Sequence, residues 1–134
     1  MPVMAPQTIN EKYAALADLY SRIEQIAKEL GGAADSVIVP VSHMIATVLD
    51  PRSEDVPALR VKMPNGFRVE FAPSGPLSTP YVLSVRVRRA HHGVPKSDCL
   101  FNFLSDGWHL TQTLLSEDEI RKCLTPEGPL PAVY

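Results

Sequence analysis

The chain has 134 residues, of which 45% are hydrophobic and 21% are charged, and its formal net charge is −2. This composition excludes a disordered chain, and one domain of this length can bury a core without metal or disulfide support. The nearly neutral charge does not by itself indicate a polyanionic partner, and no apolar run is long enough to predict a membrane span. We expect a single α+β domain over residues 1–134, with irregular tails at residues 1–7 and 125–134.

A long amphipathic helix is predicted close to the start of the chain. Thr8 and Glu11 match a capping box, and Gly31–Gly32 marks the other end. Between these signals, apolar residues recur at alternating spacings of four and three, which places them along one stripe. The stripe consists of Ile9, Tyr13, Leu16, Tyr20, Ile23, Ala27 and Leu30. Lys12 is expected on the exposed face, and the width of the apolar face favours packing on a sheet over a coiled coil.

The segment 37–49 allows two interpretations. Its β-branched residues favour a strand, whereas the apolar positions from Val41 to Leu49 also fit helical spacing. Pro40 argues against a central strand, because proline has no amide hydrogen to give to a ladder. We predict an edge strand or a bulged strand here and leave the helix as the alternative.

Residues 59–71 predict a β-hairpin. Apolar and polar side chains alternate on both sides of Asn65–Gly66, a pair typical of a two-residue turn in which both residues have positive φ. Arg60 and Lys62 are expected to point outward before the turn, and Arg68 and Glu70 after it.

Further strands and a second helix follow. Residues 81–89 alternate as a strand, and 90–97 are predicted to form a loop. A second hairpin is predicted over 99–113, with its turn at Asp106–Gly107. Ser116 and Glu119 match another capping box, which opens a short helix through Leu124.

Together these elements predict a two-layer α+β sandwich. A long N-terminal helix packs on an antiparallel sheet of about five or six strands, and a short C-terminal helix follows.

The strongest candidate for a binding surface is a basic segment. Arg86, Arg88, Arg89 and Lys96 lie between Ser84 and Ser97 without an acidic residue, so the rest of the chain carries −6. Such a cluster can bind an acidic protein surface or phosphates, although it is also typical of a solvated strand. The predicted partner-binding residues are Arg86, Arg88, Arg89, His91, His92 and Trp108.

These features favour a non-enzymatic protein-binding, adaptor or inhibitor-type protein that forms a homodimer. The first alternative is a nucleic-acid-binding module that uses the Arg86–Lys96 segment, with Phe101 and Phe103 either stacking on bases or packing in the core. The second is a small enzyme with a histidine general base. The candidate bases are His43, His91, His92 and His109.

The sequence predicts no catalytic residue set, no metal site and no cofactor, because it lacks the motifs that such sites require. Cys99 and Cys123 are expected to be buried core residues that form no disulfide. A cytoplasmic location without a secretory signal is the corresponding expectation. No motif identifies a protein family.

Overall fold

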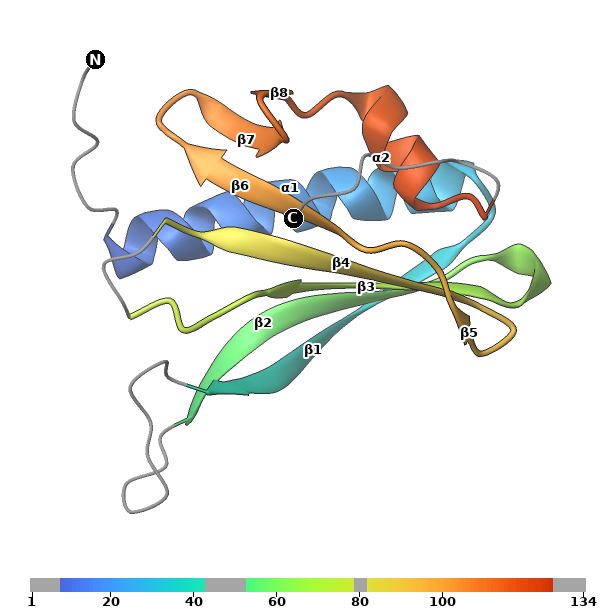
Figure 1. Ribbon diagram of the computed structural model, residues 1–134, viewed down its shortest axis with the longest axis horizontal. Helices are drawn as coiled ribbons and strands as arrows, with labels where there is room; N and C mark the ends of the chain where they lie inside the picture. The colour runs from blue at the N-terminus through green and yellow to red at the C-terminus, as the bar shows by residue number, and fades with distance from the viewer. Residues whose placement is uncertain (1–7, 43–52, 79–81, 127–134) are drawn as a thin grey trace.

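The computed structural model describes residues 8–42, 53–78 and 82–126 (Figure 1). The helices and strands in this part of the chain are α1 (Ile9–Glu29), β1 (Ala33–Ser42), β2 (Ser53–Lys62), β3 (Phe67–Pro73), β4 (Ser84–His91), β5 (Val94–Pro95), β6 (Cys99–Leu104), β7 (Gly107–Leu110), β8 (Thr113–Leu114) and α2 (Glu117–Cys123). The strands form one antiparallel sheet in the order β1-β2-β3-β4-β6-β7-β8, and β5 pairs with β4. The α+β prediction is confirmed, and the two-residue strands β5 and β8 account for the larger strand number.

Both ends of α1 are fixed by the residues that predicted them. The side chain of Thr8 accepts a hydrogen bond from the Glu11 amide at 3.1 Å. At the other end, the Gly31 amide donates to the Lys28 carbonyl and the Gly32 amide to the Ala27 carbonyl. This is a Schellman motif, and it requires the positive φ of +84° that Gly31 adopts.

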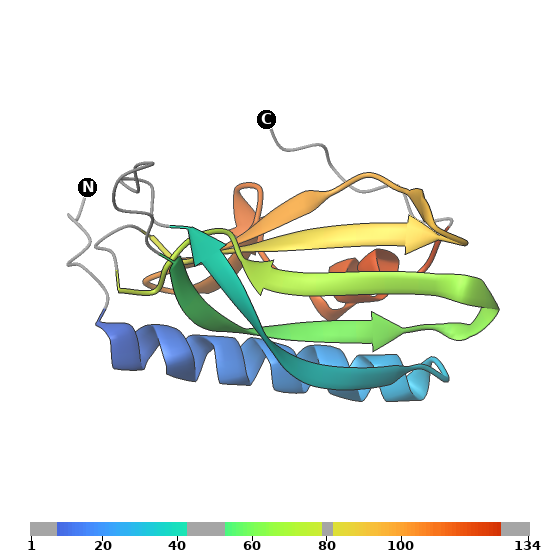
Figure 2. The same ribbon diagram turned by 90° about the horizontal axis from the view of Figure 1, so that it is seen from below.

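One face of the sheet is covered by α1, which runs along it in Figure 2. Leu19 and Ile26, which widen the apolar face beyond the predicted stripe, are buried as well, as expected for a helix that packs on a sheet. The stripe was wrong at its first turn, because Ile9 and Tyr13 are 43% and 42% exposed. Lys12 is buried instead, and its Nζ donates to the Leu77 carbonyl at 3.2 Å. The chain after β3 therefore covers the Lys12 side of this turn rather than the Ile9 side.

The core lies between this helix face and the inward residues of the strands. Phe67 and Phe71 of β3 and Phe101 of β6 are fully buried there. Phe101 is therefore a core residue, and Phe103 is partly buried beside Trp108 with ring centroids 5.2 Å apart. Cys99 and Cys123 are also buried, as predicted.

The ambiguous segment 37–49 is a strand as far as the structure describes it. β1 is the outer strand of the sheet and contains Pro40, which confirms the edge position. Residues 43–49 lie outside the described residues, as do both predicted tails apart from residues 125 and 126. β1 curves strongly: in Figure 2 it starts beside the end of α1 and finishes well away from the helix.

The hairpin between β2 and β3 has one more loop residue than predicted. Asn65 and Gly66 have positive φ values of 66° and 76°, as expected. However, the Met63 amide donates to the Phe67 carbonyl at 2.8 Å, so Pro64 joins them in a three-residue loop. The resulting register places Lys62 opposite Arg68 and Arg60 opposite Glu70.

The second half of the sheet follows the predicted pattern with two additions. The predicted hairpin over 99–113 ends its second strand at Leu110, and a turn with positive φ at Thr111 leads into β8. The segment 90–97, predicted as a loop, contains a tight turn at His92 and Gly93, both with positive φ, which pairs β5 with β4. The α2 capping box is complete: the Ser116 side chain accepts from the Glu119 amide, and the Glu119 side chain accepts from the Ser116 amide. In the part of the chain that the structure describes, no helix is both long and apolar enough to cross a membrane.

Candidate functional site

The sheet has a second face, which α1 does not cover, and we call it the open face. Antiparallel register places its residues in rows across the strands. Lys62, Arg68 and Ala90 form one row, and Asp35 of β1 begins the next. That second row continues through Arg60, Glu70 and Arg88. A third row contains Ala72, Arg86 and Leu100. Because small alanines stand between the long charged side chains, this face can form shallow grooves.

The open face is positively charged in a chain that is negative overall. Its charged residues are the cations Arg60, Lys62, Arg68, Arg86 and Arg88 and the carboxylates Asp35, Glu70 and Asp98. Five cations against three carboxylates give +2, whereas the whole chain carries −2, so the remainder carries −4. This separation of charge indicates an electrostatic preference for an acidic ligand at this face.

Two of the cations are paired within the face. Arg60 Nε lies 2.9 Å from Glu70 Oε2, and Arg86 Nη2 lies 3.1 Å from Asp98 Oδ2. The side chains of both arginines are about half exposed, at 57% and 49%. Exposed pairs of this kind contribute on the order of 0–1 kcal/mol each, so a ligand carboxylate can compete for them.

The other three cations make no ion pair with any residue that the structure describes. Lys62 and Arg68 lie directly opposite each other on β2 and β3, where like charges are destabilising. Arg88 lies opposite Glu70, but that carboxylate is bonded to Arg60. These three residues are therefore the cations best placed to receive an anionic group.

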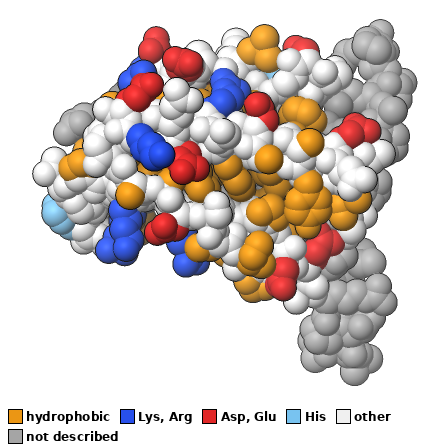
Figure 3. All heavy atoms as spheres, turned by 180° about the vertical axis from the view of Figure 1, so that it is seen from behind, with side chains coloured by type: hydrophobic (Ala, Val, Ile, Leu, Met, Phe, Trp, Pro, Cys, Tyr) orange, Lys and Arg blue, Asp and Glu red, His pale blue; other side chains and the backbone are white. Residues whose placement is uncertain are grey.

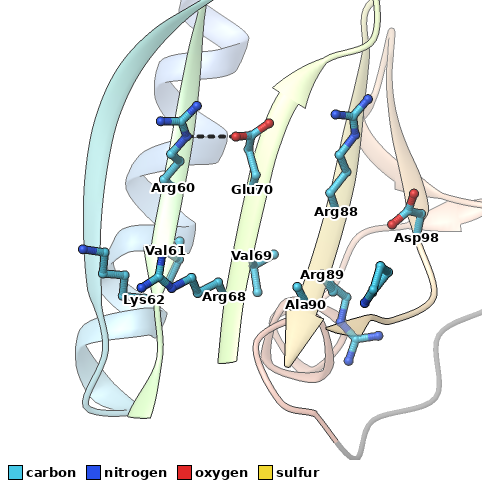
Figure 4. A pocket seen from close by; sticks show the side chains of 11 residues that line it. Arg60, Val61, Lys62, Arg68, Val69, Glu70, Arg88, Arg89, Ala90 and Asp98 are labelled. Carbon is cyan, nitrogen blue, oxygen red and sulfur yellow. Dashed lines mark hydrogen bonds and ion pairs between the residues drawn. The ribbon is translucent and has the colours of Figure 1, made fainter. Parts of the chain in front are cut away.

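These side chains line a groove of about 550 Å³, which we call the basic groove (Figure 4). Its lining includes Arg60, Lys62, Arg68, Glu70, Arg88, Ala90, Pro95 and Asp98. A second groove of about 370 Å³ shares Glu70 and Arg88 with the first. The far wall of the second groove is formed by residues 39–41 of β1, because the curvature of the sheet turns that strand toward β4. The two grooves thus form one concave surface along β3 and β4.

The predicted contact residues Arg86 and Arg88 both lie on this face, whereas Arg89 does not. Arg89 is 3% exposed and points toward α2. Its guanidinium donates to the carbonyls of Cys123, Lys122 and Thr125 and to the Ser97 hydroxyl. Burial lowers its pKa, while Cys123, Cys99 and Asp98 oppose that shift. Arg89 is therefore a structural residue that holds the end of α2, and its burial does not fit a partner contact.

The remaining predicted contacts also differ in position. His91 lies on the helix side of β4, where its Nε2 is 3.1 Å from the Asn65 carbonyl and its ring meets the edge of Phe67. His92 is exposed in the β4–β5 turn and lines a small groove with Arg68. Trp108 is 4% exposed and donates to the Ala15 carbonyl, so its burial does not fit the predicted partner contact. Only His92 of these three offers an accessible side chain near the basic groove.

One histidine has a carboxylate partner. His109 Nε2 lies 2.6 Å from Asp106 Oδ1, and this bond is the main cause that lowers the pKa of Asp106. His109 is buried, its Nδ1 has no hydrogen-bond partner, and it lines neither of the two grooves above. Within residues 8–42, 53–78 and 82–126, no three His, Cys, Asp or Glu side chains are placed to hold a metal ion. His43 lies outside these ranges.

Five residues of the basic groove were not among the predicted contacts, namely Arg60, Lys62, Arg68, Glu70 and Asp98. The outward alternation of β2 and β3 was recognised, but the two-residue turn would have placed Lys62 opposite Val69. Val61 and Val69 can lie opposite each other on the inward face only if the loop between the two strands has an odd number of residues. The alternation of apolar residues on both sides of the turn, visible in the sequence, therefore favours a three-residue loop over a two-residue loop.

Comparisons with known proteins add no family assignment. No protein-family model matches the chain, and no curated protein or solved structure matches it.

Proposed function

We propose that this chain is a non-enzymatic binding or adaptor protein whose open sheet face binds an acidic surface of a partner protein. The observation that carries this proposal is the row formed by Lys62 and Arg68, two like charges opposite each other with no carboxylate between them. Such a pair is unfavourable in the isolated protein and becomes favourable when an anion binds between the two side chains. Arg88 extends the same surface across the basic groove.

The test is capture of a partner from the native source, followed by cross-linking and mass spectrometry. We expect a protein to be retained by the wild type and lost by the triple variant Lys62→Glu, Arg68→Glu and Arg88→Glu. A matched control replaces Lys28 and Lys122, which are exposed on α1 and α2, by Glu. Equal capture by the wild type and the triple variant would contradict the proposal.

Nucleic acid is the less supported partner. Among the described residues, the aromatic side chains of Phe101 and Trp108 belong to the core and are not available to stack on bases beside the arginines. A gel-shift assay at low salt with single-stranded and double-stranded oligonucleotides distinguishes the two partner classes. Retardation that depends on Lys62 and Arg68 and falls steeply with salt would favour nucleic acid.

We also propose a cytoplasmic homodimer that uses the opposite side of the molecule. Apolar side chains gather on the face of Figure 3, and Tyr13 and Pro57 line a groove of about 370 Å³ between α1 and β1. Ile38, which pairs with Pro57 in the sheet, is 66% exposed. Free thiols at Cys99 and Cys123 are compatible with a reducing compartment. In analytical ultracentrifugation we expect the wild type to sediment as a dimer and the double variant Tyr13→Glu with Ile38→Glu to sediment as a monomer. A monomeric wild type would contradict the proposed dimer.

A further inference from the structure

We infer that the partner presents an extended acidic segment, with acidic side chains at alternate positions, and that this segment lies along the seam between β3 and β4. The inference rests on the proposed function and specifies the chemistry and the conformation of the bound partner. It depends on the positions of three arginines in successive rows of the open face.

The three arginines follow the seam in order. Arg68 on β3 occupies the first row, and Arg88 and Arg86 on β4 occupy the second and third. Successive rows are two residues apart along a strand, which corresponds to roughly 6.8 Å. An extended peptide repeats its same-side side chains at this distance. Acidic residues at positions i, i+2 and i+4 of such a peptide would therefore meet Arg68, Arg88 and Arg86 in turn.

The surroundings of the seam favour a narrow occupant. Ala72 and Ala90 flank it on β3 and β4, so the backbone of a peptide can approach the sheet there. Residues 39–41 of β1 bound one side of the concave surface, and Pro95 of β5 bounds the basic groove. A helix with its side chains is about 10–12 Å across and needs a wider channel than an extended chain does. An extended chain that lies between these two walls places its same-side side chains along the row of arginines.

The carboxylates already on this face leave the seam able to accept more negative charge. Glu70 is held by Arg60, on the side away from Arg88. Asp98 is held by Arg86, but this pair is exposed and can exchange for a peptide carboxylate. Lys62, opposite Arg68, supplies a second cation at the first row.

The experiment compares two fluorescent peptides of equal length and equal charge in an anisotropy titration with the full chain at low salt. In one peptide, three glutamates alternate with threonines; in the other, three glutamates stand four residues apart in an alanine sequence cross-linked into a helix. We expect the alternating peptide to bind at least about tenfold more tightly, because each ion pair contributes little alone and three must form together. The variant Arg68→Gln with Arg88→Gln is expected to lose about tenfold or more, and the control Lys28→Gln with Lys122→Gln no more than about twofold.

The outcomes separate this inference from the proposed function. Equal binding of both peptides, or tighter binding of a single-stranded oligonucleotide, would overturn the extended acidic segment. If neither peptide binds but partner capture still depends on Lys62, Arg68 and Arg88, the inference fails and the proposed function stands. If the Arg68 and Arg88 substitutions change neither peptide binding nor capture, both fail.

Discussion

Arg89 Nε donates a hydrogen bond of 3.0 Å to the carbonyl of Cys123, and this contact joins the middle of the sheet to the last turn of α2. The same guanidinium reaches the Lys122 and Thr125 carbonyls. One side chain therefore donates to three carbonyls at and just beyond the end of α2, where helical carbonyls lack the amides of a following turn.

Replacement of Arg89 by Met is expected to lower the free energy of unfolding by roughly 2–4 kcal/mol, because the buried carbonyls lose a charged donor. Urea denaturation measures this change. Arg88→Met is the matched control on the opposite face, with an expected change of no more than about 0.5 kcal/mol. Equal effects of the two substitutions would show that Arg89 does not hold α2.

Tyr20 connects α1 to the sheet through its hydroxyl, which lies 2.9 Å from the Pro57 carbonyl and 3.3 Å from the Phe71 carbonyl. Tyr20→Phe is expected to lower the free energy of unfolding by about 1–2 kcal/mol, since it removes the donor to buried carbonyls. Tyr13→Phe is the control, because Tyr13 is 42% exposed. Urea denaturation of both variants checks the difference, and an equally small effect would contradict it.

The contribution of the Tyr20 hydroxyl to the free energy of unfolding should also depend on pH. Burial, and secondarily the nearby Glu70 carboxylate, raises the pKa of Tyr20 above its ordinary value. The stabilisation is therefore complete below the unfolded pKa of about 10 and is lost as the pH rises through the higher native pKa. Burial lowers the pKa of Lys12, so this residue makes the free energy of unfolding rise with pH in the alkaline range, opposite to the effect of Tyr20. We expect the stability difference between wild type and Tyr20→Phe to shrink from about pH 9 to about pH 11, and a constant difference would contradict it.

Arg68→Glu should stabilise the isolated protein although it disrupts the proposed binding surface. The substitution replaces repulsion from Lys62 with attraction across the strand pair, for an expected gain of about 0.2–1 kcal/mol at low salt. The gain should diminish in high salt, where charges are screened within a few ångströms. Arg60→Glu, which places a second carboxylate beside Glu70, should have the opposite effect in the same denaturation experiment. A loss of stability in Arg68→Glu would mean that another group neutralises this row.

The two thiols should be protected from modification in the folded protein. A hydrogen bond with Cys99, together with burial, raises the pKa of Cys123, so little thiolate forms there. A thiol reagent is expected to label the native chain roughly 10²-fold or more slowly than the chain in urea. Gln112→Cys, at an exposed position between β7 and β8, provides a rapidly labelled control. Rapid labelling of the native wild type would contradict the buried position of the pair.

Local signals in the sequence predicted the framework well. Thr8, Gly31 and Ser116 marked helix ends that the structure confirms, and the alternation of β2, β3 and β4 identified the inward residues. These signals depend on interactions within a few residues, which the sequence displays directly.

The site was harder to predict because it depends on register and on strand length. A single added residue, Pro64, decides that Lys62 faces Arg68. β4 extends to His91, two residues past its predicted end, so Arg89 continues the inward alternation of Val85 and Val87. In the same way, the burial of Lys12 follows from its contact with Leu77, which is far away in the sequence.

Pro40 gives the outer strand β1 a further property. This strand borders the sheet, where exposed main-chain groups could recruit a strand from a neighbouring molecule. Pro40 has no amide hydrogen to offer, so a recruited strand could not be hydrogen-bonded continuously along all of β1. β1 is therefore a poorer template for edge-to-edge association than an outer strand without proline would be.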